Sequence, residues 1–291
     1  MSRFDAGWLR LREPFDLAAR DGGLAGRFGA ALRVERHGTH RIVDLAAGTG
    51  AGFRALAPLL GGDQDWLLVD HDPLLIAEQS AEITRWALCN GWRCRALDGQ
   101  VEVEGATGRW RARAHTLDLA LDLEALDSSA CDGVITTAFL DLVSAAWIDR
   151  LCSLLEKRRL PLLAALTVDG RRRWRPALPA DASIDEGFRR HQSTDKGFGK
   201  ALGAAAAEYL ADRLAQLGYE VSVAPSDWCI GAGEPDMLLP LIDESAAAAT
   251  EMQPAQATVL ADWATVRRMQ ACSGVLALDV GHADVLAIAS Q

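Results

Sequence analysis

Two glycines and a carboxylate in the first quarter of the chain have the types and spacing needed to hold a nucleotide. The segment RIVDLAAGTGAGFRALAPLL at 41–60 runs from an apolar stretch through Gly48 and Gly50 into a helical pattern. About 20 residues after Gly50, a second apolar stretch ends in Asp70. Glycines let the backbone approach a ligand closely, and a carboxylate on the second strand accepts hydrogen bonds from ribose hydroxyls. The pattern therefore predicts a nucleotide-binding site at the carboxyl edge of a parallel sheet.

Two classes of ligand share this layout, and residue 53 separates them. A dinucleotide fold uses the pattern G-x-G-x-x-G, whose third glycine permits tight packing of the helix on the strand. Counted from Gly48 and Gly50, that third position is Phe53. The bulk of Phe53 argues against a pyrophosphate at this turn, so an NAD(P)-dependent oxidoreductase is the alternative and not the leading hypothesis.

The run Asp44-Leu45-Ala46-Ala47-Gly48-Thr49-Gly50 resembles the first motif of class I S-adenosylmethionine-dependent methyltransferases, an acid followed by x-G-x-G-x-G. Ala46 stands where that motif has its first glycine. The resemblance implies S-adenosyl-L-methionine as cofactor. It also implies that Asp44 helps to hold the methionine amino group and that Asp70 binds the ribose.

Later segments extend the resemblance. In HTLDLALDLEAL at 115–126, Asp118 matches the family's acid that contacts the adenine amino group, with Leu119 beside the ring. Asp118 also fits the simpler role of a helix cap, because Asp is favoured at that position. His71 could contact the cofactor or lie on an exposed loop. The segment 132–147 resembles the fourth motif and would place three residues near the methionine and the substrate, namely Thr137, Ala138 and Phe139.

The elements that must position these residues follow an α/β pattern, in which short apolar runs alternate with helical stretches. We predict a Rossmann-like sheet of seven mostly parallel strands, with helices on both faces and a helical insertion before the last strand. The expected strands are Arg41–Leu45, Trp66–Asp70, Arg111–Leu117, Gly133–Thr137, Leu162–Val168, Tyr219–Ala224 and Asp284–Ala289. A small hairpin is expected within 92–113.

The domain organisation follows from these elements. Residues 1–40 are expected to form an N-terminal helical cover, from which Arg12 or Arg20 could face the methionine carboxylate. Residues 41–291 would form the methyltransferase domain. Two of its segments, at about 169–200 and 231–272, are expected on the substrate side, because additions to a parallel sheet usually shape a pocket.

Few side chains are needed for the chemistry, because a sulfonium methyl is already activated and the enzyme mainly aligns the reactants and excludes water. A general base would help with a hydroxyl or protonated amine. The candidates are His191, Asp141, Asp195, Asp227 and His282, with His191 and Asp141 preferred. The arginines of RRRWR at 171–175 are expected in a loop, where they could pair with an anionic substrate, remain in water or lie at an oligomer contact.

The composition of the chain limits the kinds of molecule that we expect it to bind. The 291 residues include 30 Lys and Arg against 40 Asp and Glu, a net charge of −10 with His neutral. This sign argues against nucleic acid and favours a small-molecule methyl acceptor. No apolar run reaches the roughly 18 residues of a membrane span. The N-terminus lacks a secretory signal, which predicts a cytoplasmic location. None of the six cysteines forms a CxxC pair, so no metal site is expected. A catalytically silent cofactor-binding scaffold remains a second alternative.

Overall fold

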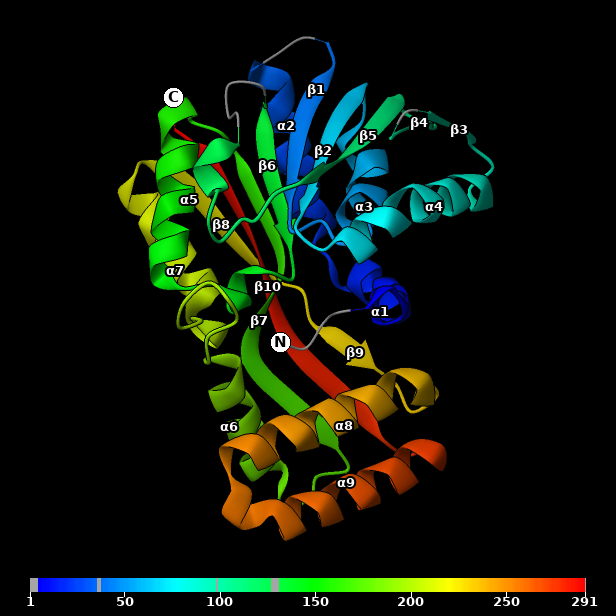
Figure 1. Ribbon diagram of the computed structural model, residues 1–291, viewed down its shortest axis with the longest axis vertical. Coiled ribbons are helices and arrows are strands. Elements are labelled where there is room, and N and C mark those ends of the chain that lie inside the picture. Colours follow the sequence, from blue (N-terminus) through cyan, green and yellow to red (C-terminus); the bar gives the residue numbers. More distant parts are fainter. Residues whose placement is uncertain (1–4, 36–37, 98, 127–130, 291) are drawn as a thin grey trace.

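A single twisted sheet organises the protein. The computed structural model describes residues 5–35, 38–97, 99–126 and 131–290 (Figure 1). Hydrogen-bonded neighbours follow the order β3-β4-β5-β2-β1-β6-β7-β10-β8, and β9 pairs with β10. The strands are β1 His40–Leu45, β2 Gln64–Asp70, β3 Arg93–Leu97, β4 Gln100–Glu104, β5 Arg109–Thr116, β6 Gly133–Thr137, β7 Leu162–Arg175, β8 Tyr219–Pro225, β9 Trp228–Ile230 and β10 Ala277–Ala289. The predicted fold class is confirmed.

The sheet is mostly parallel. The pairs β5–β2, β2–β1, β1–β6 and β6–β7 are parallel, whereas β10 runs antiparallel to both β7 and β8. Each of the seven predicted strands is present. Among the described residues the sheet has ten strands, three more than the predicted core. The additional three are β9 and the two strands of the β3–β4 hairpin, which lies within the predicted 92–113 segment.

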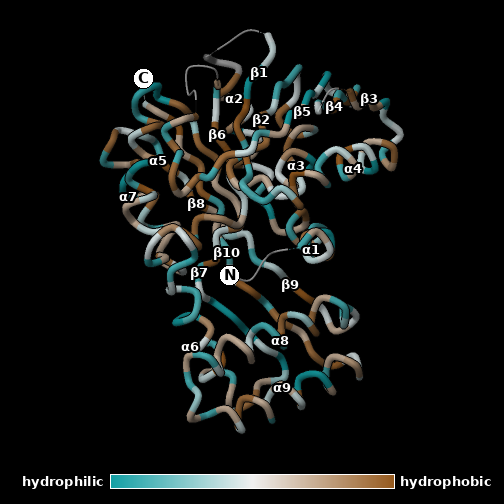
Figure 2. The backbone as a smooth tube through the Cα atoms, in the orientation of Figure 1, coloured by the Kyte–Doolittle hydropathy of each residue, from teal (hydrophilic) through white to brown (hydrophobic). Residues whose placement is uncertain are grey.

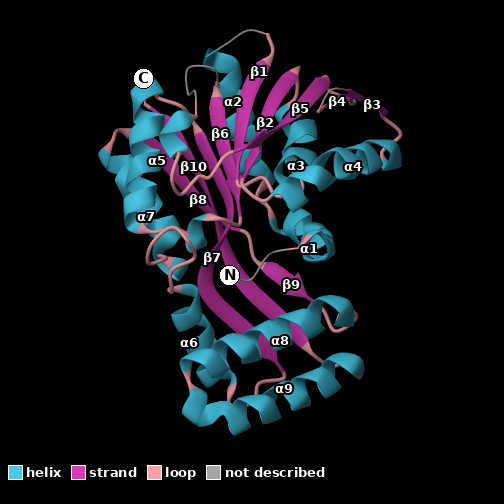
Figure 3. Ribbon diagram, in the orientation of Figure 1, coloured by secondary structure: helices cyan, strands magenta, loops and turns pink. Residues whose placement is uncertain are grey.

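Helices cover both faces of the sheet (Figure 3). Apolar residues of α2, α3 and α4 share one core with side chains of β1 and β2 such as Ile42 and Leu68. On the other face, α5 and α7 pack on Val43 and Leu45 of the same strand β1. The alternation arises because successive strand residues point to opposite faces. The helices are α1 Ala6–Ala19, α2 Gly22–Glu35, α3 Ala51–Leu60, α4 Pro73–Cys89, α5 Ala145–Arg158, α6 Asp181–Gln192, α7 Ala206–Gln216, α8 Pro235–Met252 and α9 Ala257–Cys272.

Strands β7 and β10 are longer than predicted and continue together beyond the central sheet as an arm, where β9 pairs with β10. Their pairing continues as far as Ala277 opposite Arg175. The expectation that 171–175 is a loop was therefore wrong. The burial of side chains alternates along this segment, as it does in a strand. Arg171 and Arg173 are exposed, whereas Trp174 is buried and the side chain of Arg172 is 3% exposed.

The arm carries a third apolar core with α6, α8 and α9, and the position of α8 and α9 confirms the predicted helical insertion before the last strand. Trp174, Trp228 and Trp263 belong to this core, and Trp8 and Phe15 of α1 pack against it. In Figure 2 the tube of α8 and α9 alternates between brown and teal, as expected for helices with one apolar face. Among the described residues, no helix combines the length and apolarity needed to cross a membrane.

Candidate active site

A cavity of about 550 Å³ lies between the carboxyl ends of the sheet strands and the lobe that α6, α8 and α9 form on the β7–β10 arm. Its walls come from the turns after β1, β2 and β6, from α1, and from β7, α6, α8 and β10. Ligand sites in open α/β sheets occupy this edge of the sheet. Its position and size make it the candidate active site.

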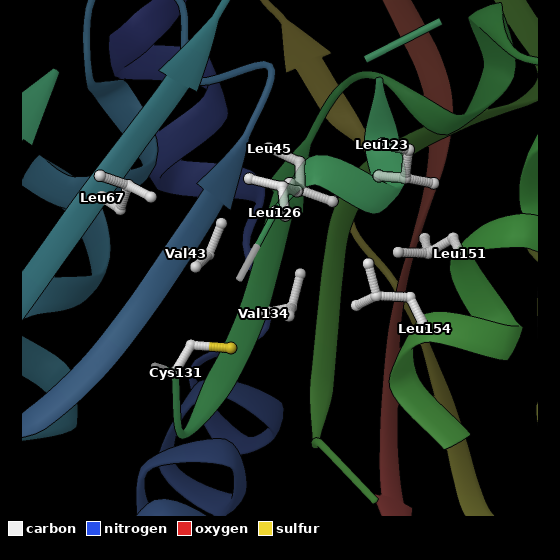
Figure 4. A pocket seen from close by; sticks show the side chains of 9 residues that line it. All are labelled: Val43, Leu45, Leu67, Leu123, Leu126, Cys131, Val134, Leu151 and Leu154. Carbon is white, nitrogen blue, oxygen red and sulfur yellow. The ribbon is translucent and has the colours of Figure 1, made fainter. Parts of the chain in front are cut away.

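Figure 4 shows a second and much smaller cavity, inside the sheet's own core. Its volume is about 20 Å³, and only apolar side chains and a cysteine line it. Val43 and Val134 reach it from β1 and β6, and Leu151 and Leu154 reach it from α5. A space that small holds at most a water molecule and offers no hydrogen bonds. It is a packing defect and not a binding site.

The turn after β1 has the backbone conformation that glycines favour. Gly48 and Gly50 have φ of 54° and 84°, and a Cβ at Gly50 would lie 3.3 Å from Leu68 Cδ1. Ala46 also adopts positive φ, at 55°, which costs an L-residue roughly 1–2 kcal/mol. Thus Ala46, like Gly48 and Gly50, adopts the left-handed backbone conformation that glycine favours.

Asp70, at the end of β2, organises this turn. Its Oδ2 accepts from the backbone N–H of Gly48 at 2.7 Å, while Oδ1 accepts from His71 and Asp72 at 2.8 and 3.0 Å. Two carboxylate oxygens offer about four lone-pair sites. Asp70 lines the cavity and is 6% exposed, so it retains capacity for a hydroxyl donor on a ligand.

Asp44, at the end of β1, is the most unusual group in the cavity. It is 1% exposed, yet neither carboxylate oxygen has a hydrogen-bond partner. Burial raises its pKa to about 8, an effect that the nearby Arg20 charge opposes and Asp70 reinforces. A Cβ at Gly52 would lie 2.5 Å from Asp44 Oδ2, so glycine there makes room for the carboxylate. The group is suited to a cationic donor.

Helix α1 closes the cavity over the glycine turn. Glu13 is bound by the buried Arg54 of α3, at 2.6 Å from Nη2, which anchors the helix. Arg12 lines the cavity, pairs with Asp16 at 2.9 Å and stacks 4.7 Å from the Trp228 ring.

Arg20 follows the last residue of α1. It donates from Nη2 to Thr137 Oγ1 at 3.1 Å, whereas its Nε and Nη1 are buried without a partner. Burial lowers the pKa of this guanidinium, and Asp16 is the leading charge that opposes the effect. Because Thr137 lines the cavity, Arg20 stands immediately behind its wall.

The end of β6 and the turn after it bring three predicted residues and one candidate base together. Thr137, Ala138 and Phe139 all line the cavity, and Ala138 adopts a positive φ of 51°. Asp141 follows them, 5% exposed, with Oδ1 lacking a partner. Burial raises its pKa to about 6, so its carboxylate can take up a proton near neutral pH.

His282 of β10 also lines the cavity and is 2% exposed. Burial lowers its pKa to about 4, and its Nδ1 lies 3.0 Å from the carbonyl oxygen of Val280. The neutral ring therefore carries its proton on Nδ1 and its lone pair on Nε2. His191 of α6 lines the cavity too; burial lowers its pKa, and its Nε2 lies 3.5 Å from Glu251.

The cavity gathers most of the predicted site residues. Those that line it are Asp44, Ala46, Gly48, Asp70, His71, Leu119, Thr137, Ala138, Phe139, Asp141, His191 and His282. Gly50 shapes the turn without lining the cavity. Sequence reasoning missed Gly52 and Gln192. The position of Gly52 relative to Asp44 indicates that it makes room for the carboxylate only when the strand-to-helix geometry is known.

Three predicted residues lie elsewhere. Asp118 is exposed, does not line the cavity and accepts from the backbone N–H of Ala120 at 2.9 Å within a turn, whereas Asp122 is the N-cap of the 3-10 helix that follows. Asp195 accepts from Gly197 N at 2.7 Å, and Asp227 binds Arg171. Neither of the last two lines the cavity, because Asp195 holds the backbone of its own loop and Asp227 pairs with Arg171 of β7. The adenine role of Asp118 stays a prediction.

Comparisons with known proteins concern the fold. No family model matches the chain, and no curated protein matches it. A methyltransferase from Geobacter sulfurreducens in complex with S-adenosyl-L-homocysteine is 15% identical, with 92% of this chain and 91% of that chain covered and a TM-score of 0.41. A cyclopropane-fatty-acyl-phospholipid synthase-like protein from Lactobacillus casei is 12% identical, with 94% and 98% covered and a TM-score of 0.47. Phospholethanolamine N-methyltransferase 2 from Haemonchus contortus, in complex with S-adenosylhomocysteine, is 14% identical, with 91% of this chain and 53% of that chain covered and a TM-score of 0.41.

Proposed function

We propose that the protein is an S-adenosyl-L-methionine-dependent methyltransferase acting on a small molecule. The observation that carries the proposal is Asp44, a buried carboxylate that lines the cavity with both oxygens unpartnered. An ammonium group would supply the missing donors. Asp70 on the neighbouring strand retains lone pairs for a sugar hydroxyl. Together the two carboxylates match a ligand that carries an amino-acid group and a nucleoside.

The rival ligand, a dinucleotide, fits this arrangement poorly. A pyrophosphate offers no donor to either oxygen of Asp44. Phe53 is fully buried and packs edge-on against Trp66 and Trp86, with ring centroids 5.4 and 5.7 Å apart. It therefore fills the space in which a dinucleotide fold brings helix and strand together over its third glycine. Both features support the methyltransferase over the oxidoreductase.

The cofactor would supply a methyl group on a sulfonium. The protein's own residues would bind the cofactor, orient it and shield it from water. Asp44, Asp70 and the turn at 46–50 would hold the cofactor, while α1 covers the turn and excludes water. On the acceptor side, Asp141 Oδ1 is buried and unpartnered, which suits it to accept a proton from a hydroxyl or an amine. His282 Nε2 is a second acceptor of protons.

Thermal denaturation with three ligands tests the proposal. S-adenosyl-L-methionine and S-adenosyl-L-homocysteine should both raise the melting temperature, because binding to the native state alone stabilises it. NADH should not. If only NADH raises the melting temperature, the oxidoreductase is correct. If the nucleosides bind but no methyl transfer occurs across a broad panel of small acceptors, the protein is the silent scaffold.

A further inference from the structure

We call the part of the cavity lined by β7, α6 and α8 its acceptor half. One buried cation in this half lacks the hydrogen bonds that its donors require. The side chain of Arg172 lines the cavity and is 3% exposed. Its Nη2 donates to Ser245 Oγ at 2.7 Å, whereas Nε and Nη1 are buried without a partner. Buried polar groups are almost always hydrogen-bonded, so unpartnered donors beside a cavity point to a ligand.

Aromatic rings hold the Arg172 guanidinium in place. Its central carbon lies 4.4 Å from the Phe188 ring centroid and 5.0 Å from that of Trp174. The nearest carboxylate, Asp185, lies 3.7 Å from Nε, which is too long for a hydrogen bond. Burial lowers the pKa of Arg172, and Asp185 opposes this effect. The guanidinium is thus a fixed planar donor whose countercharge does not use its N–H groups.

Lys196 adds a second cation to the same half of the cavity. It lines the cavity, and its Nζ donates to Thr194 Oγ1 at 2.9 Å. Within the described part of the chain, Lys196 forms no ion pair with a carboxylate closer than 4.0 Å, although the charges of Glu251 and Glu244 act on it and that of Glu244 also acts on Arg172. Glu251 and Glu244 are both exposed, so solvent screens their charges. Lys196 is therefore a cation at the cavity wall without a paired carboxylate.

We propose that Arg172 and Lys196 bind an anionic group on the methyl acceptor, a carboxylate or a phosphate monoester. The unpartnered Nε and Nη1 of the fixed guanidinium can each donate to an oxygen of such a group in a charge-assisted hydrogen bond. Phe188, Phe198 and Leu241 line the cavity and would pack on an apolar or aromatic body. The proposal that this anion belongs to the acceptor rests on the proposed function, whereas the anion site itself stands on the geometry of Arg172.

Three variants isolate the site. Arg172→Met removes the guanidinium and keeps an apolar stem, and Lys196→Gln removes the second cation from a loop where misfolding is less of a risk. Arg173→Met is the matched control, because Arg173 is the next residue on β7, is exposed and does not line the cavity. Circular dichroism and melting temperature establish that each variant is folded.

Calorimetric titration with benzoate, phenyl phosphate and benzamide provides the readout. Benzoate or phenyl phosphate should bind the wild type at least about tenfold more tightly than the neutral amide, and the stronger of the two identifies the kind of anion. Arg172→Met should weaken that binding by roughly 10- to 100-fold, the loss expected for a charged hydrogen-bond partner. Lys196→Gln should weaken it less, and Arg173→Met should leave it unchanged.

Several results would overturn the anion site. They are equal binding of the amide and both anions, no binding of any of the three, unchanged anion binding in both Arg172→Met and Lys196→Gln, or an equal loss in Arg173→Met. Titration of the same samples with S-adenosyl-L-homocysteine separates this proposal from the proposed function. Anion binding without nucleoside binding refutes the methyltransferase alone, and nucleoside binding without anion binding refutes the anion site alone.

Discussion

The pH dependence of nucleoside binding at Asp44 offers a sharp test, because this carboxyl changes its protonation state when a cation binds. In the free protein, burial raises the Asp44 pKa to about 8, so the carboxyl is mostly protonated at neutral pH. An ammonium group in contact with it favours the carboxylate. Binding of S-adenosyl-L-homocysteine should therefore release a proton from Asp44, and the affinity should rise with pH.

The magnitude follows from the pKa. Below pH 8 the ligand has to displace a proton, so each unit of pH lowers the affinity by up to tenfold. Between pH 8 and pH 6 the affinity should fall by roughly 50-fold in the wild type, because Asp44 is already half protonated at pH 8. Asp44→Asn keeps the size of the side chain and its space beside Gly52 but cannot ionise. That variant should lose the pH dependence and bind more weakly than the wild type at pH 8.

Folding stability provides a second readout for the same residue, with a definite sign. The folded-state pKa lies above the ordinary value of 3.8, so the native state holds the Asp44 proton more tightly than the unfolded chain. The stability that this group contributes is complete below pH 4 and is lost as pH rises towards 8, by an amount on the order of 5 kcal/mol. Asp44→Asn should flatten this decline in urea denaturation.

Titration calorimetry from pH 6 to 8.5, in two buffers of different ionisation enthalpy, measures the affinity and the proton release together. Asp65→Asn serves as the control, because Asp65 is also an aspartate of a sheet strand, β2, but pairs with Arg111 and does not line the cavity. A pH slope that survives in Asp44→Asn, or a wild type without any slope, would refute the role of Asp44 as the ammonium receptor.

Three further perturbations test the remaining geometry. Asp70→Ala should weaken nucleoside binding by roughly 1–3 kcal/mol in calorimetry and also lower the melting temperature, because it leaves backbone donors of the turn unpaired; full retention of both would contradict its assignment. Gly52→Ala should destabilise the protein by about 1–3 kcal/mol in urea, since its Cβ would meet Asp44, whereas Gly26→Ala has open space and should not destabilise it. Burial raises the pKa of Cys152 to about 12, so a thiol reagent should modify exposed Cys89 quickly and Cys152 only on unfolding; similar rates would disprove the packing of α5.

Much of the fold and the cofactor half of the cavity could be predicted from the sequence, because both depend on local patterns. The glycine turn at 46–50 is encoded by residues that tolerate a left-handed backbone, and Asp44 and Asp70 are placed at strand ends by short apolar runs. The β-like fragments bounded by glycines within 92–113 also located the edge hairpin. These features need only the residues beside them, which is why reasoning from the chain succeeded there.

The acceptor half depends on contacts between distant segments, and prediction failed there. The charge of RRRWR suggested a solvated loop, whereas β10 pairs with it and makes it a strand. Arg172 and Trp174 lie on the same face of β7. Their burial becomes evident only when α6 and α8 cover that face. Asp227 fits the description of a strand-end acid, yet it holds Arg171, because the ion pair spans residues far apart in the chain.

The crystal structure of the protein with S-adenosyl-L-homocysteine tests the central claim most directly. We expect the ligand's amino group within hydrogen-bond distance of Asp44 and a ribose hydroxyl within hydrogen-bond distance of Asp70, with the turn at 46–50 against the ligand. Electron density for the ligand outside this cavity, or inside it with Asp44 still unpartnered, would contradict the account.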